Sequence, residues 1–122
     1  MVVELFIAES GKYLVCRVTG QITAEDARQM VEQIEKFAHE TGAKSRLIDV
    51  RNATNVSSIS GNYDLAYKYL EELQVARSSR AAVLVSPDDS SHDFAMIVIQ
   101  NAGFNCRKYT DEATAIDWLV ED

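Results

Sequence analysis

The sequence predicts a single α/β domain, in which a β-hairpin is followed by alternating helices and strands around a mostly parallel sheet. Two strand-like runs are joined by Ser10-Gly11-Lys12, a connection short enough for a hairpin. Amphipathic helical stretches and short apolar runs then alternate to the end of the chain. The 122 residues, 47% apolar and 25% charged, suit one globular core without a linker. We therefore expect the order β-β-α-β-α-β-α-β-α, with about five strands and four helices in one domain spanning residues 1–122.

The first strands follow from short alternating or apolar runs. The hairpin strands are predicted over Val2–Glu9 and Tyr13–Thr19, with Gly20 ending the second. A central strand is predicted over Leu47–Val50, and the polar run Arg51–Asn55 is predicted to be a loop. Because a helix separates this central strand from the hairpin, a right-handed parallel crossover is expected. In open α/β sheets such strand ends usually carry the site.

The first two helices are marked by their ends and by apolar spacing. Thr23 and Asp26 have the spacing of a capping box, and Gly42 gives a stop signal. Apolar residues between them recur at helical spacing. A second helix is predicted from about Ser60 to Arg77.

The remaining elements follow the same alternation. A buried strand is predicted within Arg80–Ser86, a third helix over Ser91–Ala102, a last strand over Asn105–Tyr109 and a final helix after it. The third helix contains Phe94–Ile99, which is rich in β-branched residues and resembles a strand, but its serine start and glycine stop favour a helix. Trp118, the only tryptophan, is predicted to anchor the final helix to the core.

Composition excludes several kinds of partner. The net charge of −7 and the absence of a basic cluster argue against nucleic acid and anionic membranes. No apolar run is long enough to span a bilayer, and the N-terminal stretch lacks signal-peptide features, so a cytoplasmic location is expected. Cys16 and Cys106 lie in strand-like runs and are predicted to be buried free thiols. No metal motif, cofactor motif or catalytic grouping is recognisable.

The stretch Arg46–Gly61 resembles the signature of the STAS domain, the fold of bacterial anti-sigma-factor antagonists of the SpoIIAA type. That signature is an apolar strand ending in Asp-Leu-Ser, followed by Asp-Ser-Ser-Gly at a helix start. Here Asp49-Val50-Arg51 and Val56-Ser57-Ser58-Ile59-Ser60-Gly61 occupy those places. Further motifs resemble a divergent SpoIIAA-like branch, and their order covers nearly the whole chain: Tyr63–Leu73, Ala82–Val85, Asn101-Ala102-Gly103 and Ala115–Leu119.

The resemblance implies an interaction module whose candidate partner or phosphorylation residues are Asp49, Arg51, Ser57, Ser58 and Ser60. In the antagonists a kinase phosphorylates a serine of the turn, but this chain lacks the turn aspartate and is one residue longer there. Ser58 keeps the distance from Asp49, whereas Ser60 keeps the adjacent glycine. A serine at a helix start is also a common cap, and capping is the interpretation we favour.

Two other functions stay open. Related sheets resemble the lipid-binding CRAL-TRIO fold, which implies a small-molecule or lipid pocket lined by Tyr63, Tyr67 and Phe94. For the two tyrosines we favour ordinary packing with the hydroxyls at the rim, and an aromatic partner surface is the alternative. The apolar helix around Phe94–Ile99 also suggests a homodimer face. The third function is an enzyme, and its candidate groups lie at the carboxyl ends of predicted strands: Asp49, Arg51, Asp88, Asp89, Ser90 and His92.

Overall fold

The computed structural model describes all residues, 1–122, and confirms the predicted α/β class. Its five-stranded sheet has the order β1-β2-β3-β4-β5. β1 and β2 form the predicted antiparallel hairpin, while β2, β3, β4 and β5 are parallel. The strands span Val2–Ile7, Leu14–Ile22, Arg46–Asn55, Ala81–Leu84 and Cys106–Tyr109.

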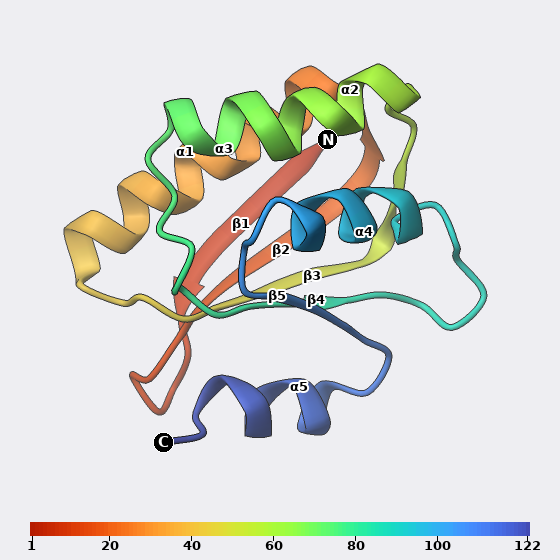
Figure 1. The fold of residues 1–122 in the computed structure, drawn as a ribbon. Helices are drawn as coiled ribbons and strands as arrows, with labels where there is room; N and C mark the ends of the chain where they lie inside the picture. The colour runs from red at the N-terminus through yellow and green to blue at the C-terminus, as the bar shows by residue number, and fades with distance from the viewer.

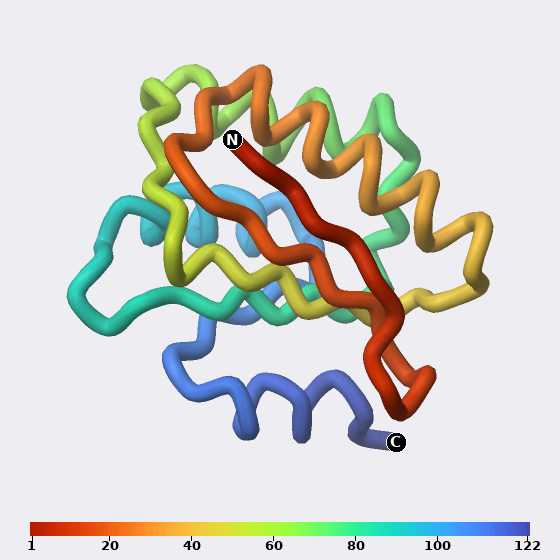
Figure 2. The backbone as a smooth tube through the Cα atoms, turned by 180° about the vertical axis from the view of Figure 1, so that it is seen from behind, coloured from red at the N-terminus to blue at the C-terminus, as the bar shows by residue number.

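The helices cover the two faces of the sheet unequally (Figure 1). One face is covered by α1 (Ala24–Thr41), by α4 (Asp93–Asn101) and by a long helix made of α2, η1 and α3. The other face is covered by α5 (Glu112–Leu119) alone, as the view from behind also shows (Figure 2). Because α5 packs beneath the middle of the sheet and its last strands, the hairpin end of this face has no helix over it.

The first helix and the third are as predicted. Thr23 and Asp26 form the capping box of α1, and Gly42 ends it with a left-handed backbone (φ 79°). The stretch Phe94–Ile99 is helical within α4, so the choice of helix over strand is confirmed. Ala95, Met96 and Val98 are buried against the sheet, whereas Ile97 is exposed.

Two predicted boundaries at the central strand are wrong. β2 does not end at Gly20 but passes through it to Ile22, and β3 continues through the predicted loop Arg51–Asn55. The extended β2 pairs with this second half of β3, after an irregularity in register between Arg17 and Thr19. Main-chain hydrogen bonds to β2 thus hold these polar residues of β3 in an extended strand, although their local preferences favour a loop.

The second helix is shorter than predicted and changes its geometry along its length. It runs as α2 (Ile59–Asp64), the π-helical η1 (Leu65–Tyr69) and α3 (Leu70–Glu72). The helix ends at Gln74, whose φ is 58°. The Gln74 and Val75 N–H groups donate to the carbonyls of Glu71 and Leu70, which is the pattern of a Schellman motif. The predicted end at Arg77 is wrong, because the residue that adopts the left-handed backbone after this helix is a glutamine, Gln74, and not the usual glycine.

Candidate functional site

The serine-rich corner after β3 is built as a helix cap. The Ser58 hydroxyl accepts a hydrogen bond from the Gly61 N–H at 3.0 Å, so Ser58 is the N-cap of α2. The Ser60 hydroxyl lies 3.2 Å from the Ser58 hydroxyl. The Ser57 N–H donates to the side chain of Asn55 at 2.9 Å. Ser58 and Ser60 are exposed and Ser57 is half-buried, so only the first two are open to a kinase or a partner.

Gly61 lets this corner pack closely on the start of α1. A Cβ added at Gly61 would lie 2.9 Å from the Cβ of Ala24 and 3.2 Å from the Ser58 hydroxyl. The first distance is well inside van der Waals contact, so any side chain at position 61 pushes α2 away from α1.

We therefore expect Gly61→Val to lower the free energy of unfolding by about 2 kcal/mol, the typical cost of overpacking. Urea denaturation measures this loss. Adding Ala24→Gly to Gly61→Val removes the nearest clashing atom and is expected to restore about half of it. Equal losses in the single and double variants would contradict the proposed contact with Ala24.

Asp49 and Arg51 form a separate ion-pair cluster near α5. The Asp49 carboxylate accepts hydrogen bonds from the Arg51 Nε (3.0 Å) and Nη2 (2.9 Å), and the Arg17 Nε lies 3.4 Å away. Arg51 also lies 3.9 Å from the carboxylate of Glu112 in α5. Its contacts join this cluster to β2 and α5, not to the serines. The structure therefore divides the predicted partner residues between two places.

Opposing effects set the pKa of Asp49. Burial by itself raises the pKa of this carboxyl, but the hydrogen bonds from Arg51 and the charges of Arg51 and Arg17 outweigh burial and lower it below its ordinary value. A carboxyl group with a depressed native pKa stabilises the fold above its unfolded-state pKa, about 4. That stabilisation is lost as the pH falls through the lower native pKa.

We expect Asp49→Asn to be less stable than the wild type at pH 7 and to lose less stability than the wild type between about pH 4 and pH 2. Urea titrations across this range measure both effects. Asp88→Asn, at an exposed aspartate, is the control and should leave the pH dependence nearly unchanged. Parallel stability curves for Asp49→Asn and the wild type would contradict the role given to Asp49.

The aromatic candidates form a cluster on the outer side of α2 and η1. The rings of Tyr63 and Tyr67 are stacked at 6.2 Å, and the edge of Phe94 meets Tyr63 at 5.6 Å. Four of the six exposed large apolar side chains lie on this part of the chain: Val56 (46%), Ile59 (70%), Tyr63 (47%) and Tyr67 (53%). The other two are Ile97 (53%) on α4 and Val2 (68%) on β1. We call Ser58, Ser60, Ile59, Tyr63 and Tyr67 the corner surface.

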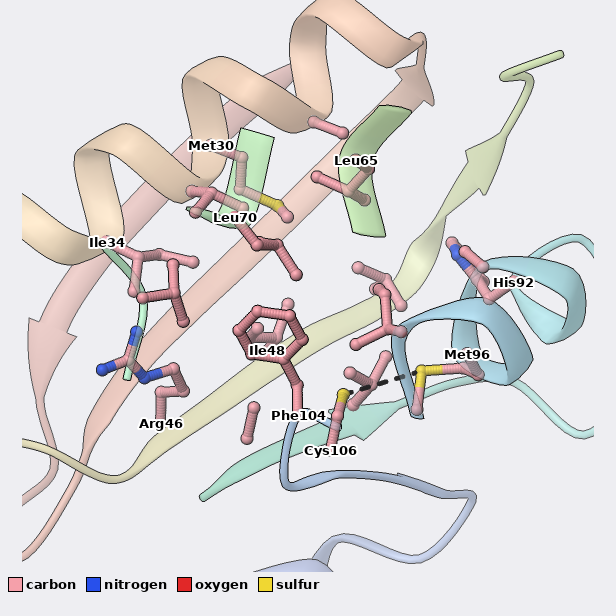
Figure 3. A pocket seen from close by; sticks show the side chains of 18 of the residues that line it. Met30, Ile34, Arg46, Ile48, Leu65, Leu70, His92, Met96, Phe104 and Cys106 are labelled. Atoms are coloured by element: carbon pink, nitrogen blue, oxygen red, sulfur yellow. Dashed lines mark hydrogen bonds between the residues drawn. The ribbon is translucent and has the colours of Figure 1, made fainter. Parts of the chain in front are cut away.

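A cavity of about 130 Å³ lies on the inner side of the long helix, between the sheet and the helices α1, α3 and α4 (Figure 3). Mainly apolar side chains line it, among them Met30, Leu70, Met96 and Phe104. Tyr63, Tyr67 and Phe94, which were predicted to line a pocket, do not line this cavity. An unfilled apolar cavity of this volume lowers stability by about 3 kcal/mol relative to a filled one.

The cavity's volume limits what it can hold. An apolar cavity of about 150 Å³ takes benzene, so this one suits a compact ring or a short branched chain. A long lipid acyl chain does not fit. Cys106 borders the cavity and its Sγ lies 3.9 Å from the Sδ of Met96. Both cysteines are buried free thiols, as predicted, and burial raises the pKa of each to about 12.

The candidate enzyme groups near His92 are engaged with one another and with the backbone. The His92 Nε2 lies 2.9 Å from the carbonyl oxygen of Ala53 and 3.5 Å from the carboxylate of Asp89. The Ser91 hydroxyl accepts the Asn55 N–H at 3.0 Å. These contacts tie the loop before α4 to the end of β3. No group of three or more acidic, histidine or cysteine side chains is placed to bind a metal ion.

Comparison with known proteins identifies the class. The chain is similar over 97% of its length, and over 92% of the other's, to an uncharacterised Shewanella loihica protein with a SpoIIAA-like fold (21% identity, TM-score 0.60). It is also similar to the anti-sigma factor antagonist SpoIIAA in unphosphorylated form (17% identity, TM-score 0.57), with coverage of 99% of this chain and 100% of that one.

The phosphorylated form of the Bacillus cell fate determinant SpoIIAA is similar as well (17% identity, TM-score 0.52), with 97% and 99% of the two chains covered. The SpoIIAA-like family model matches residues 13–120, and the chain belongs to the SpoIIAA-like family. The family resemblance predicted from the sequence is therefore confirmed. No curated protein matches the sequence. None of the helices combines the length and apolarity needed to cross a bilayer.

Proposed function

We propose that this protein is a non-catalytic regulatory module that acts in the cytoplasm and binds a regulatory protein through the corner surface. The observation that carries this proposal is the gathering of exposed apolar side chains beside Ser58 and Ser60. Aromatic side chains are enriched in the buried centres of protein interfaces, and serine hydroxyls suit the polar rim. SpoIIAA itself, a fold relative, is described as an anti-sigma factor antagonist.

The proposal is tested by capture of partners from a lysate of the native host. Ile59, in the corner surface, is 70% exposed, and Val2 is 68% exposed on β1. We expect the wild type and Val2→Ser to retain one stoichiometric partner, and Ile59→Ser to lose it. Retention by Ile59→Ser, loss by both variants, or no stoichiometric partner with the wild type would contradict the proposal.

Phosphorylation of the corner is proposed at Ser60 rather than at Ser58 or Ser57. Ser58 already caps α2 and Ser57 is half-buried, whereas Ser60 is exposed with only the Ser58 hydroxyl as its side-chain partner. Negative charge in the first turn of a helix is electrostatically favourable. Intact-mass measurement of protein from its native host should show a phosphorylated fraction that Ser60→Ala abolishes. A fraction that persists in Ser60→Ala would assign the modification elsewhere.

A homodimer through α4 remains a second form of the interaction proposal. Of the predicted face Phe94–Ile99, Ile97 is the residue most open to solvent (53%), since much of this helix is buried against the sheet. Light scattering on purified protein measures the dimer directly. A dimer that Ile97→Lys disrupts would support an interface at α4. A protein that stays monomeric at high concentration would contradict the homodimer.

A further inference from the structure

The cavity shown in Figure 3 adjoins an outer groove at the end of α1. This groove has a volume of about 380 Å³ and lies between the end of α1, the start of β3 and the segment before β4. Four residues border both spaces: Glu35, Arg46, Ala76 and Ser79. A molecule that entered the cavity from the groove would pass between these side chains.

Arg46 is the charged group at this passage. Its side chain is only 7% exposed, and its Nη1 forms an ion pair with the carboxylate of Glu35, which is 22% exposed. Its Nε and Nη2 donate to the carbonyl oxygen of Lys44 at 3.3 and 3.0 Å. An arginine side chain has five N–H donors. These three bonds leave one donor uncommitted on each terminal nitrogen, a pair that a carboxylate can engage.

The charges around the groove also favour an anion. Besides Arg46, its lining includes Lys44, and Glu35 is its only acidic residue. The cavity behind Arg46 is lined almost entirely by apolar atoms, among them those of Ile34 on α1, Ile48 on β3 and Phe104 before β5. A charged recognition group thus stands at the mouth of a compact apolar space.

We propose that this passage and cavity bind a small monocarboxylate with a compact apolar body, such as an aryl or short branched carboxylate. The carboxylate takes the two uncommitted donors of Arg46, and the apolar body occupies the cavity. The volume of about 130 Å³ sets the size of the body at about that of a benzene ring. This site is separate from the corner surface and does not depend on the proposed interaction function.

Methionine methyl groups report occupancy of the cavity. The chain has three methionines, of which Met30 and Met96 line the cavity and Met1 does not. In protein carrying ¹³C-methyl methionine, we expect titration with benzoate to shift the Met30 and Met96 signals saturably and to leave Met1 nearly unmoved. Benzamide, the neutral molecule of the same shape, should bind about tenfold more weakly, since it lacks the charge that pairs with Arg46.

Three variants test the role of Arg46. Glu35→Gln removes the competing carboxylate and should tighten benzoate binding several-fold while hardly changing that of benzamide. Arg46→Lys keeps the charge but not the planar fork, and should weaken benzoate binding. Arg80→Lys is the matched control, because Arg80 bonds to carbonyl groups near α5, on the other face of the sheet, and it should leave binding unchanged.

Several results would overturn the proposal. Absence of saturable shifts at Met30 and Met96 would exclude ligand entry, and equal affinities for benzoate and benzamide would exclude carboxylate recognition. Unchanged benzoate affinity in Glu35→Gln would mean that the Glu35–Arg46 pair is structural only. The same Met30 and Met96 shifts with millimolar inorganic phosphate alone would mean that an anion in the outer groove causes them, without an apolar body in the cavity.

Discussion

Arg46→Met should lower the free energy of unfolding by about 3–5 kcal/mol, the typical cost of removing one partner of a buried ion pair. Arg46 is buried at the start of β3, where it joins Glu35 of α1 to the carbonyl of Lys44. Without the guanidinium, the Glu35 carboxylate loses its ion-pair partner and the Lys44 carbonyl loses two hydrogen bonds. Urea denaturation at pH 7 measures the loss.

The matched control for this prediction is the double variant Glu35→Met/Arg46→Met. Replacing both members of a buried ion pair by apolar groups of similar volume is often nearly neutral, so the double variant should recover most of the stability. A loss below about 1 kcal/mol in Arg46→Met would show that the pair is effectively hydrated. The same small loss in both variants would remove the basis for placing a buried charge at the cavity mouth.

Trp118→Ala should cost about 3–5 kcal/mol of stability, as is typical for the loss of a large buried aromatic side chain. Trp118 is buried beneath the sheet, with its ring 6.0 Å from that of Tyr109 and with the Arg107 guanidinium 4.6 Å from its centre. Its carbonyl accepts a hydrogen bond from Arg80 at 2.7 Å. Since α5 alone covers this face, no other helix can replace its contacts.

Hydrogen exchange distinguishes local detachment of α5 from a general loss of stability. In Trp118→Ala we expect the amides of Glu112–Leu119 to exchange faster than those of α1, since α1 packs on the opposite face. Trp118→Phe keeps most of the apolar contact and should lose only about 1 kcal/mol. Equal acceleration of exchange in α1 and α5 would contradict the view that α5 is a separately anchored layer.

Much of the fold could be predicted because its local signals agree with its tertiary contacts. The capping box of Thr23 and Asp26, the stop at Gly42 and the hairpin at Ser10–Lys12 are local features, and each is present in the structure. The order of elements then limits the topology, because a helix between two strands favours a parallel crossover. The ends of elements were less predictable where a distant partner decides them.

The errors have identifiable physical causes. Arg51–Asn55 forms a strand because β2 supplies its hydrogen-bond partners, which the local polar sequence does not reveal. The helix from Ile59 ends at Gln74, where a non-glycine residue adopts a left-handed backbone. The π-helical turn Leu65–Tyr69 has no sequence signal that we recognise.

The candidate site was predictable only in part. The serine-rich turn and the neighbouring tyrosines are identified from their order along the chain, and in the structure Ser58 and Ser60 are exposed and the two tyrosines are stacked on the helix that follows. Asp49, from the same stretch, pairs instead with Arg51 and Arg17, and Arg51 reaches Glu112 of α5. The cavity and the charge of Arg46 at its mouth were missed. A void depends on how side chains from distant elements fail to fill space, which periodicity along one element does not encode.

The most direct test of the corner surface is site-specific photo-crosslinking in the native host. A photoreactive phenylalanine derivative placed at Tyr67 should give one discrete adduct with a regulatory protein, and the same group at Val2, on β1, should not give it. Identification of that adduct by mass spectrometry would support the docking role of the corner. The same adducts from both positions, or no adduct from Tyr67, would contradict it.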